Sequence, residues 1–188
     1  MKKKFFLNLA VMLVAGTLAA ADTTLDFTAL NELPKNINSY GSNAKLELGT
    51  VNGKKAVQSK ILRMAKGRNY GGISVTLKNR IPWDQFDAVR VTILNTDKAV
   101  TKVHCIIYDE ANNVWRTDLP ASFDDYYTFQ KDAFNYNYTE SKIKPATPPT
   151  EKLGKIKLIV ISADFRKGDE QTINLTIPEI IFEKKEQK

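Results

Sequence analysis

Hydrophobic and polar residues alternate with a period of two along most of the chain after residue 22, and no stretch keeps a helical period. Turn-forming residues separate the alternating stretches, and Asn52-Gly53 is the strongest hairpin signal because both residues tolerate positive φ. The pattern predicts an all-β fold, a β-sandwich or jelly roll of two antiparallel sheets. The predicted strands are Thr24–Phe27, Lys45–Leu48, Ala56–Met64, Gly72–Leu77, Ala88–Asn95, Lys102–Tyr108, Val114–Asp118, Tyr126–Gln130, Lys155–Ala163 and Thr172–Phe182.

The alternation also divides the side chains of these strands into two sets, because neighbours in a strand point to opposite faces. A solvated outer face more often carries Lys and Glu, so a polar set with Arg, His and Tyr is a candidate ligand surface. The apolar set, expected in the core, is Ile73, Val75, Leu77, Val89, Val91, Ile93, Val103, Cys105 and Ile107. The polar set is Ser74, Thr76, Arg90, Thr92, His104, Ile106 and Tyr108.

The first 21 residues have a different pattern, that of a secretory signal peptide. A basic start, Met1–Lys4, precedes an apolar run, Phe5–Leu18, and the small residues Ala19–Ala21. The apolar run is shorter than the roughly 20 residues of a membrane-spanning helix, so we expect cleavage after Ala21 rather than an uncleaved anchor. The remaining residues, 22–188, are expected to form one secreted or periplasmic domain with no membrane span.

The net charge of +7 falls to +4 once the three lysines of the predicted signal peptide are removed. A nucleic-acid-binding surface has a basic stripe interleaved with aromatic residues, and the charge here is instead spread along the chain. We therefore expect no nucleic-acid partner. Cys105 and His104 are the only residues of their types, which excludes an internal disulfide and a two-histidine metal site.

Catalytic motifs are absent from the sequence. A hydrolase needs paired carboxylates, or a nucleophile with a base. The adjacent acidic pairs Asp109-Glu110 and Asp124-Asp125 lie in predicted turns, where we expect them to be solvated. Neither a glycine-rich phosphate loop nor a Gly-x-Ser-x-Gly elbow is present, so the sequence predicts a protein that is not an enzyme.

Aromatic residues carry the strongest functional signal. Sugars bind to exposed aromatic rings that stack on their apolar C–H faces, with polar side chains contacting the hydroxyls around them. Outward parity should let Arg90 and His104 meet across a sheet, and the basic chain mildly favours an acidic glycan. The candidate carbohydrate-binding residues are Tyr70, Arg90, His104, Tyr108, Trp115 and Tyr126. Trp83 and Phe86, framed by apolar residues, are expected in the core.

Several segments occur in an order with a familiar outline. Gly71-Gly72-Ile73-Ser74-Val75 precedes Ile81–Val89, and Val103–Trp115 carries Asp109 before its turn. Tyr127–Phe129, Phe134 and the closing segments Leu153–Ile156 and Ile177–Phe182 follow. This order resembles that of galactose-binding-like jelly-roll carbohydrate-binding modules over nearly the whole of residues 22–188. The related complex I intermediate-associated protein family shares the outline.

The resemblance implies a galactose-binding-like jelly roll that binds a poly- or oligosaccharide on its concave sheet face without catalysis. It also implies a structural calcium near the termini, for which Asp26 and Glu179 are the candidate ligands. One alternative is a structural or interaction protein of the cell envelope with no sugar site. A more distant one is a small glycan-active hydrolase or lyase that uses His104 with Tyr108 or an acidic neighbour. Exposed coplanar aromatics would favour binding, and a face covered by residues 135–154 would favour the structural role.

Overall fold

All ten predicted strands are present in the computed structural model, and two short ones, β2 and β10, were not predicted. The strands are β1 Thr23–Asp26, β2 Ile37–Tyr40, β3 Ala44–Val51, β4 Lys54–Arg63, β5 Tyr70–Pro82, β6 Ala88–Leu94, β7 Val100–Asp109, β8 Val114–Pro120, β9 Tyr126–Gln130, β10 Asn135–Tyr136, β11 Lys155–Phe165 and β12 Gln171–Glu183. Two single-turn 3-10 helices are η1 Trp83–Gln85 and η2 Lys131–Ala133.

The structure describes residues 22–41, 43–65, 69–94, 96–122, 125–137, 140, 145, 149, 151–152 and 154–184. The predicted signal peptide and its cleavage point lie outside these residues. Within the described ranges, no helix has the length and apolar character needed to cross a membrane.

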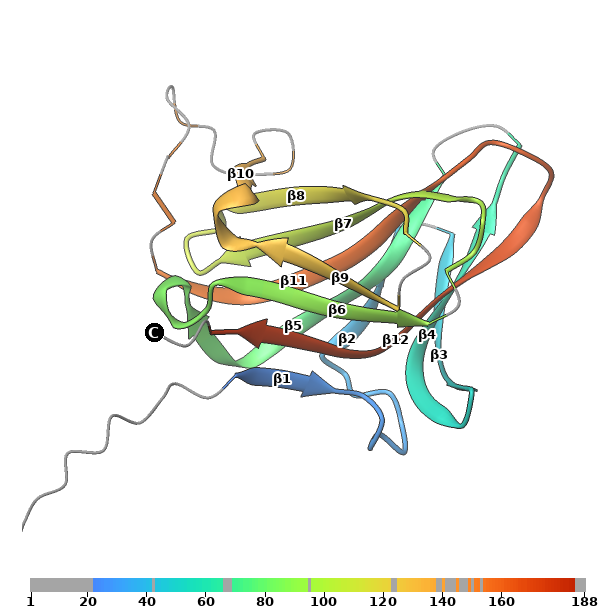
Figure 1. Cartoon of the computed structure of the whole chain (residues 1–188), viewed down its shortest axis with the longest axis horizontal. Coiled ribbons are helices and arrows are strands. Elements are labelled where there is room, and N and C mark those ends of the chain that lie inside the picture. Colours follow the sequence, from blue (N-terminus) through green and yellow to red (C-terminus); the bar gives the residue numbers. More distant parts are fainter. Residues whose placement is uncertain are drawn as a thin grey trace, which may run out of the picture.

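Two antiparallel sheets pack face to face (Figure 1). Sheet A has the order β3-β4-β12-β6-β9, with β1 paired to β12, and sheet B has the order β10-β8-β7-β11-β5-β2. Consecutive strands often lie in different sheets, as in the step from β6 to β7. The predicted β-sandwich jelly roll of two antiparallel sheets is therefore confirmed.

The core lies between the sheets and contains all nine residues that the alternation assigned to it. Trp83 and Phe86 are buried as predicted, with their ring centroids 5.4 Å apart. Cys105 is also buried, and this burial raises the pKa of its thiol well above the usual value. The thiol therefore stays protonated and packs as a small apolar group.

Turn chemistry follows the sequence at three places. Asn52 and Gly53 both have positive φ, 51° and 77°, and close the β3–β4 hairpin as predicted. Asn112 has φ 65° at the tip between β7 and β8. Pro178, which has no backbone N–H to donate to a neighbouring strand, lies where the β12–β6 register shifts between Thr176 and Glu179.

The prediction of a solvated Asp109 is wrong, because this side chain is 1% exposed. Its carboxylate accepts hydrogen bonds from the Asn113 backbone N–H at 2.8 Å and the Asn113 side-chain amide at 2.9 Å. The Trp115 indole N–H donates to it at 3.4 Å. Asp109 therefore closes the β7–β8 turn. Asp124, in the second acidic pair, lies outside the described residues.

Candidate functional site

The polar set of the sequence prediction points outward, but the structure divides it between the two sheets. Arg90 lies on β6 in sheet A, whereas His104 and Tyr108 lie on β7 in sheet B. The expectation that Arg90 and His104 meet across one sheet is therefore wrong. Arg90 instead pairs with Glu183, with 2.9 Å between Nε and Oε1. Alternation shows which side chains point away from the core but not which sheet carries them.

Two further candidates are also separated from His104. Trp115 is 2% exposed and points into the core, where its ring meets Trp83 edge-on at 6.0 Å between centroids. Tyr126 is 58% exposed but lies on β9, at the edge of sheet A. The prediction that Trp115 belongs to the carbohydrate-binding face together with His104 is therefore wrong. Of the six candidates, the structure brings together Tyr70, His104 and Tyr108.

These three residues surround a hollow in the outer face of sheet B, and the strand register explains it. One row of paired residues crosses five strands in the order Tyr40, Gly72, Ser162, His104 and Asp118. The two central strands, β5 and β11, contribute the small residues, and the flanking strands contribute the large ones. A side chain at position 72 would collide with the β11 backbone at Ile161 and Ser162, so glycine is required there. The small central residues leave the floor of the face low.

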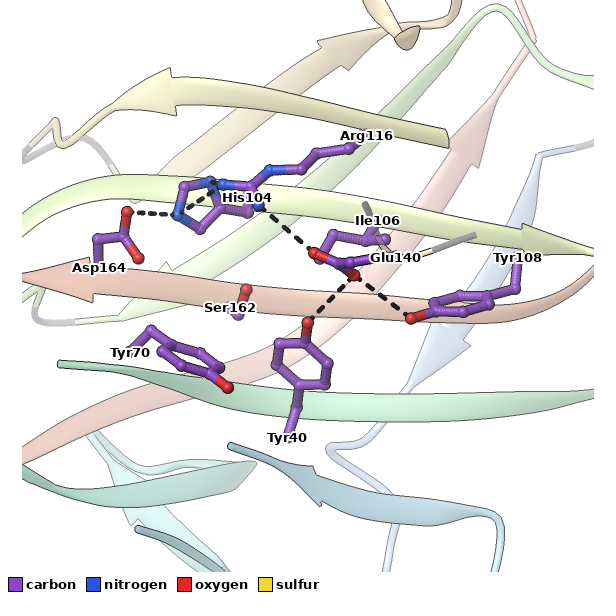
Figure 2. Close-up of a pocket in the computed structure, with 9 residues that line it drawn as sticks. All are labelled: Tyr40, Tyr70, His104, Ile106, Tyr108, Arg116, Glu140, Ser162 and Asp164. Carbon is purple, nitrogen blue, oxygen red and sulfur yellow. Dashed lines mark hydrogen bonds and ion pairs between the residues drawn. The ribbon is translucent and has the colours of Figure 1, made fainter. Parts of the chain in front are cut away.

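The hollow has a volume of about 430 Å³ and is drawn in Figure 2. We call it the sheet B pocket. Its walls come from five strands and from Glu140, which follows β10. The lining residues are Tyr40, Tyr70, His104, Ile106, Tyr108, Arg116, Glu140, Ser162 and Asp164.

His104 forms the centre of a polar network at one side of the pocket. Its Nδ1 lies 2.9 Å from Arg116 Nη2 and 3.3 Å from Asp118 Oδ1, and its Nε2 lies 3.0 Å from Asp164 Oδ2. Because guanidinium groups only donate, the neutral tautomer that fits has an unprotonated Nδ1 and an Nε2–H donating to Asp164. The side chain is 3% exposed. His104 therefore positions Arg116 and Asp164, both of which are partly exposed.

Glu140 closes the other side of the pocket. The hydroxyls of Tyr40 and Tyr108 donate to its Oε2 at 3.3 and 3.4 Å, and Arg116 Nη1 lies 3.6 Å from its Oε1 (Figure 2). Burial is the main cause that raises the pKa of Tyr108 to about 12, and the nearby charge of Glu140 is the second. The same two causes raise the pKa of Tyr40 as well. Both hydroxyls are therefore protonated and can donate hydrogen bonds at neutral pH.

Asp118 extends the network beyond the pocket. Partial burial alone would raise the pKa of this carboxyl, but the hydrogen bond and charge of Arg116 lower it. Arg116 Nε donates to Asp118 Oδ1 at 2.9 Å. The guanidinium of Arg116 is thus held between two carboxylates and the imidazole.

The candidate calcium ligands lie opposite each other, Asp26 on β1 and Glu179 on β12. Each carboxylate already accepts a threonine hydroxyl, from Thr28 at 2.7 Å and Thr92 at 2.9 Å. Among the described residues, no group of three or more His, Cys, Asp or Glu is placed to hold a metal. Ca²⁺ takes roughly six to eight oxygen ligands, and these two carboxylates supply only a small part of that number. The pair therefore does not fit the ion well.

Comparisons with known proteins identify the fold. No protein-family model matches the sequence, and no curated protein matches it. The family 11 carbohydrate-binding module of a cellulosomal cellulase of Clostridium thermocellum is a structural match with a TM-score of 0.62 and 14% identity. The alignment covers 90% of this chain and 98% of that module. The chain has the fold of a family 11 carbohydrate-binding module.

Two other solved structures support this jelly-roll assignment. A family 11 module from Clostridium thermocellum in complex with a β-1,3-1,4-mixed-linked tetrasaccharide matches with a TM-score of 0.60 and 14% identity, covering 88% of this chain and 98% of the module. An agarase matches with a TM-score of 0.53 and 14% identity over 86% of this chain and 25% of the agarase. The predicted galactose-binding-like jelly roll is confirmed as a fold. The link to the complex I intermediate-associated family stays a prediction.

Several pocket residues were not among the sequence candidates. Trp115 and Arg116 are neighbours in β8, so their side chains point to opposite faces of the sheet. Had Trp115 been assigned to the core, alternation would have identified Arg116 as outward. Tyr40 lies on the short unpredicted strand β2, and Glu140 lies in a stretch without strand character. Nothing in the sequence pairs these two residues with Tyr108.

Proposed function

We propose that this protein binds carbohydrate in the sheet B pocket and does not catalyse a reaction there. The observation that carries the proposal is the arrangement of three tyrosines, Tyr40, Tyr70 and Tyr108, around a low floor of small residues on a jelly-roll sheet. Tyrosine combines an apolar ring, which can cover the C–H face of a sugar, with a hydroxyl that bonds to sugar hydroxyls. In this proposal, the concave face expected from the sequence is the outer face of sheet B.

The charges of the pocket favour a neutral sugar over an acidic one. Glu140 and Asp164 line it together with one guanidinium, that of Arg116. That guanidinium is already paired with Asp118 and lies near Glu140. A uronic carboxylate would meet a surplus of negative charge, whereas sugar hydroxyls can donate to these same oxygens. The acidic glycan favoured by the net charge of the chain is therefore not the ligand we propose for this pocket.

The first ligands to test follow from the structural matches. One matching family 11 module was solved with a β-1,3-1,4-mixed-linked tetrasaccharide, and another match is an agarase. We therefore propose mixed-linked β-glucan and agarose as neutral test polysaccharides. Affinity is expected to be modest because the pocket is open and buries little of its ligand.

Affinity electrophoresis in gels that contain each polysaccharide tests the proposal. We expect the wild type to be retarded and Tyr70→Ala to migrate as if no polysaccharide were present, since it loses one of the three rings. Tyr126→Ala is the matched control, an exposed tyrosine on the other sheet, and it should be retarded like the wild type. Circular dichroism must first show that both variants fold. A wild type that no neutral polysaccharide retards, or equal losses in the two variants, would contradict the proposal.

The alternative is a structural or interaction protein, and contacts on the same face favour it. Glu140 bridges Tyr40 and Tyr108, and a small apolar cluster of Ile106, Val114 and Val160 is buried on this outer face. The rings of Tyr40 and Tyr70 are tilted by 59°, so they do not form one flat platform. If this role is correct, Glu140→Ala will lower the melting temperature while the wild type binds no polysaccharide.

The catalytic alternative has an observation on its side, since His104 lies beside Asp118 and Asp164. Both ring nitrogens, however, already have partners, and the ring is almost fully buried. A general base needs a nitrogen within reach of the substrate. We therefore assign His104 a positioning role within the binding proposal.

We also propose that the chain is exported and that its mature form begins at Asp22. The proposal rests on the basic start, the short apolar run and the small residues before position 22. N-terminal sequencing of the protein recovered from the periplasm or medium tests it. A secreted protein that still begins at Met1 would contradict it.

A further inference from the structure

A second hollow, of about 500 Å³, lies at the end of the sandwich where strands of both sheets meet. We call it the end hollow. It is formed by the end of β4, the start of β12 and the β6–β7 and β11–β12 connections, which lie at the right in Figure 1. The lining residues are Arg63, Asp97, Lys98, Ala99, Arg166, Lys167 and Gln171. It is separate from the sheet B pocket, since the two share no lining residue.

The end hollow concentrates positive charge. Four cationic side chains line it with one carboxylate, that of Asp97, which accepts the Ala99 backbone N–H at 2.7 Å within its own turn. Among the described residues, none of the four cations forms an ion pair with a carboxylate. Asp169 and Glu170 follow in the same connection but do not line the hollow.

The lack of ion pairs sets the arginines of the end hollow apart from the other described arginines. Arg80, Arg90 and Arg116 each pair with a carboxylate. Of the arginines that the structure describes, the two without such a partner are Arg63 and Arg166, and both line the end hollow. Four cations gathered around a single carboxylate repel one another, and a bound anion would relieve that repulsion.

The scaffold beneath these cations is already ordered. Arg63 Nε donates to the Asp169 carbonyl at 2.9 Å, and its Nη2 donates to Gln171 Oε1 at 3.2 Å. The Arg166 backbone N–H donates to the Ala99 carbonyl at 2.8 Å, which ties the β11–β12 connection to the β6–β7 connection. Arg63 and the backbone of the two connections therefore lose little conformational entropy when an anion binds.

We propose that the end hollow binds the anionic groups, sulfate or carboxylate, of an acidic polysaccharide. Arginine presents a planar fork of donors that matches both groups. The choice of a polysaccharide as carrier rests on the proposed function. Asp164 lines the sheet B pocket, and Arg166 follows it by two residues, roughly 7 Å along an extended chain. One glycan can therefore place neutral rings among the tyrosines and a charged group among the cations.

The test compares polysaccharides that differ in charge. Isothermal titration at low ionic strength uses dextran, dextran sulfate and polygalacturonate as ligands. We expect the wild type to bind at least one of the charged polymers and to bind dextran more weakly. Binding should weaken as salt is added, because the hollow is open to solvent.

Two double variants with the same change in net charge locate the binding. Lys98→Gln/Arg166→Gln removes two cations of the end hollow and is expected to weaken binding roughly tenfold or more. Lys78→Gln/Lys155→Gln removes two exposed cations that do not line it, and we expect a change of less than about twofold. Equal losses would show that only net charge matters and would overturn the proposal. Failure of the wild type to bind either charged polymer, including the case in which it binds vesicles of anionic lipid, would also overturn it.

A third variant separates this proposal from the function proposed above. Tyr70→Ala, which tests the sheet B pocket on neutral polysaccharide, should leave binding of dextran sulfate through the end hollow within about twofold of the wild type. Loss of neutral binding with retention of charged binding shows two independent sites. If Tyr70→Ala abolishes both, the end hollow does not bind on its own and the proposal fails.

Discussion

The outer faces of the two sheets differ in how they satisfy their polar groups. On sheet A, charges and hydroxyls pair two by two, as in Arg90 with Glu183 and Lys60 with Glu47. On sheet B, a group of polar side chains beside the hollow forms one connected network, with the buried His104 near its centre. Exposed pairs contribute little to stability, whereas a buried network depends on every member.

The size of the residues on the central strands accounts for much of this difference. In sheet B the small residues Gly72 and Ser162 lie side by side on β5 and β11, with tyrosines and His104 on the flanking strands. In sheet A the β12 outer face carries larger residues such as Thr176 and Ile181, next to Leu94 and Arg90 on β6. The same period-two pattern therefore leaves a low floor of small residues at the centre of the sheet B face, whereas larger side chains occupy these positions of sheet A.

Glycine substitutions test this contrast and should give the largest effect. Gly72→Ala places a methyl group against the β11 backbone, which cannot move aside without separating β5 from β11, so we expect loss of the folded state or of more than about 3 kcal/mol. Gly49→Ala on sheet A meets the flexible side chain of Gln58 and should change stability by less than about 1 kcal/mol. Urea denaturation measures both, and equal costs would contradict the steric argument.

Substitutions in the sheet B network and in an ion pair of sheet A should give the next largest difference in stability. His104→Ala leaves a cavity and removes the partner of Arg116 and Asp164, so we expect a loss of roughly 2–4 kcal/mol. Arg90→Ala removes a partly exposed ion pair and should cost less than about 1 kcal/mol. His104→Gln, which can still accept and donate a hydrogen bond, should lose less than His104→Ala. A cost at Arg90 as large as that at His104 would show that the faces do not differ.

Alkaline pH gives the smallest effect and probes the tyrosines of sheet B. The folded protein holds the pKa of Tyr108 at about 12, above the usual 10.0, so folding favours the protonated form. Stability should therefore fall as the pH rises from about 10 through about 12, and Tyr108→Phe should remove part of that fall. Glu140→Gln should lower the pKa of Tyr108, which absorbance titration of tyrosinate can follow. An unchanged pKa in Glu140→Gln would contradict the contact with Glu140.

The pattern of the sequence predicted most of the fold because that part of the information is local. Period-two alternation located ten strands and the inward residues, and Asn52-Gly53 located a hairpin. Of the two strands it missed, β10 has two residues, too few for a period, and β2, Ile-Asn-Ser-Tyr, does not alternate between apolar and polar residues. Asp109 was misread as solvated because its partners, Asn113 and Trp115, come together only when the turn has formed.

The sequence by itself determined which side chains face the core and which face outward, because a strand alternates whatever its neighbours are. Only the tertiary structure decided that β6 and β7 belong to different sheets, which separated Arg90 from His104 and joined His104 to Arg116 and Asp164. Sheet membership depends on pairings between segments far apart in the chain, such as β11 with β5 and β7. A local pattern contains no information about those pairings. It therefore predicted which side chains point inward or outward, but not the sheet B pocket.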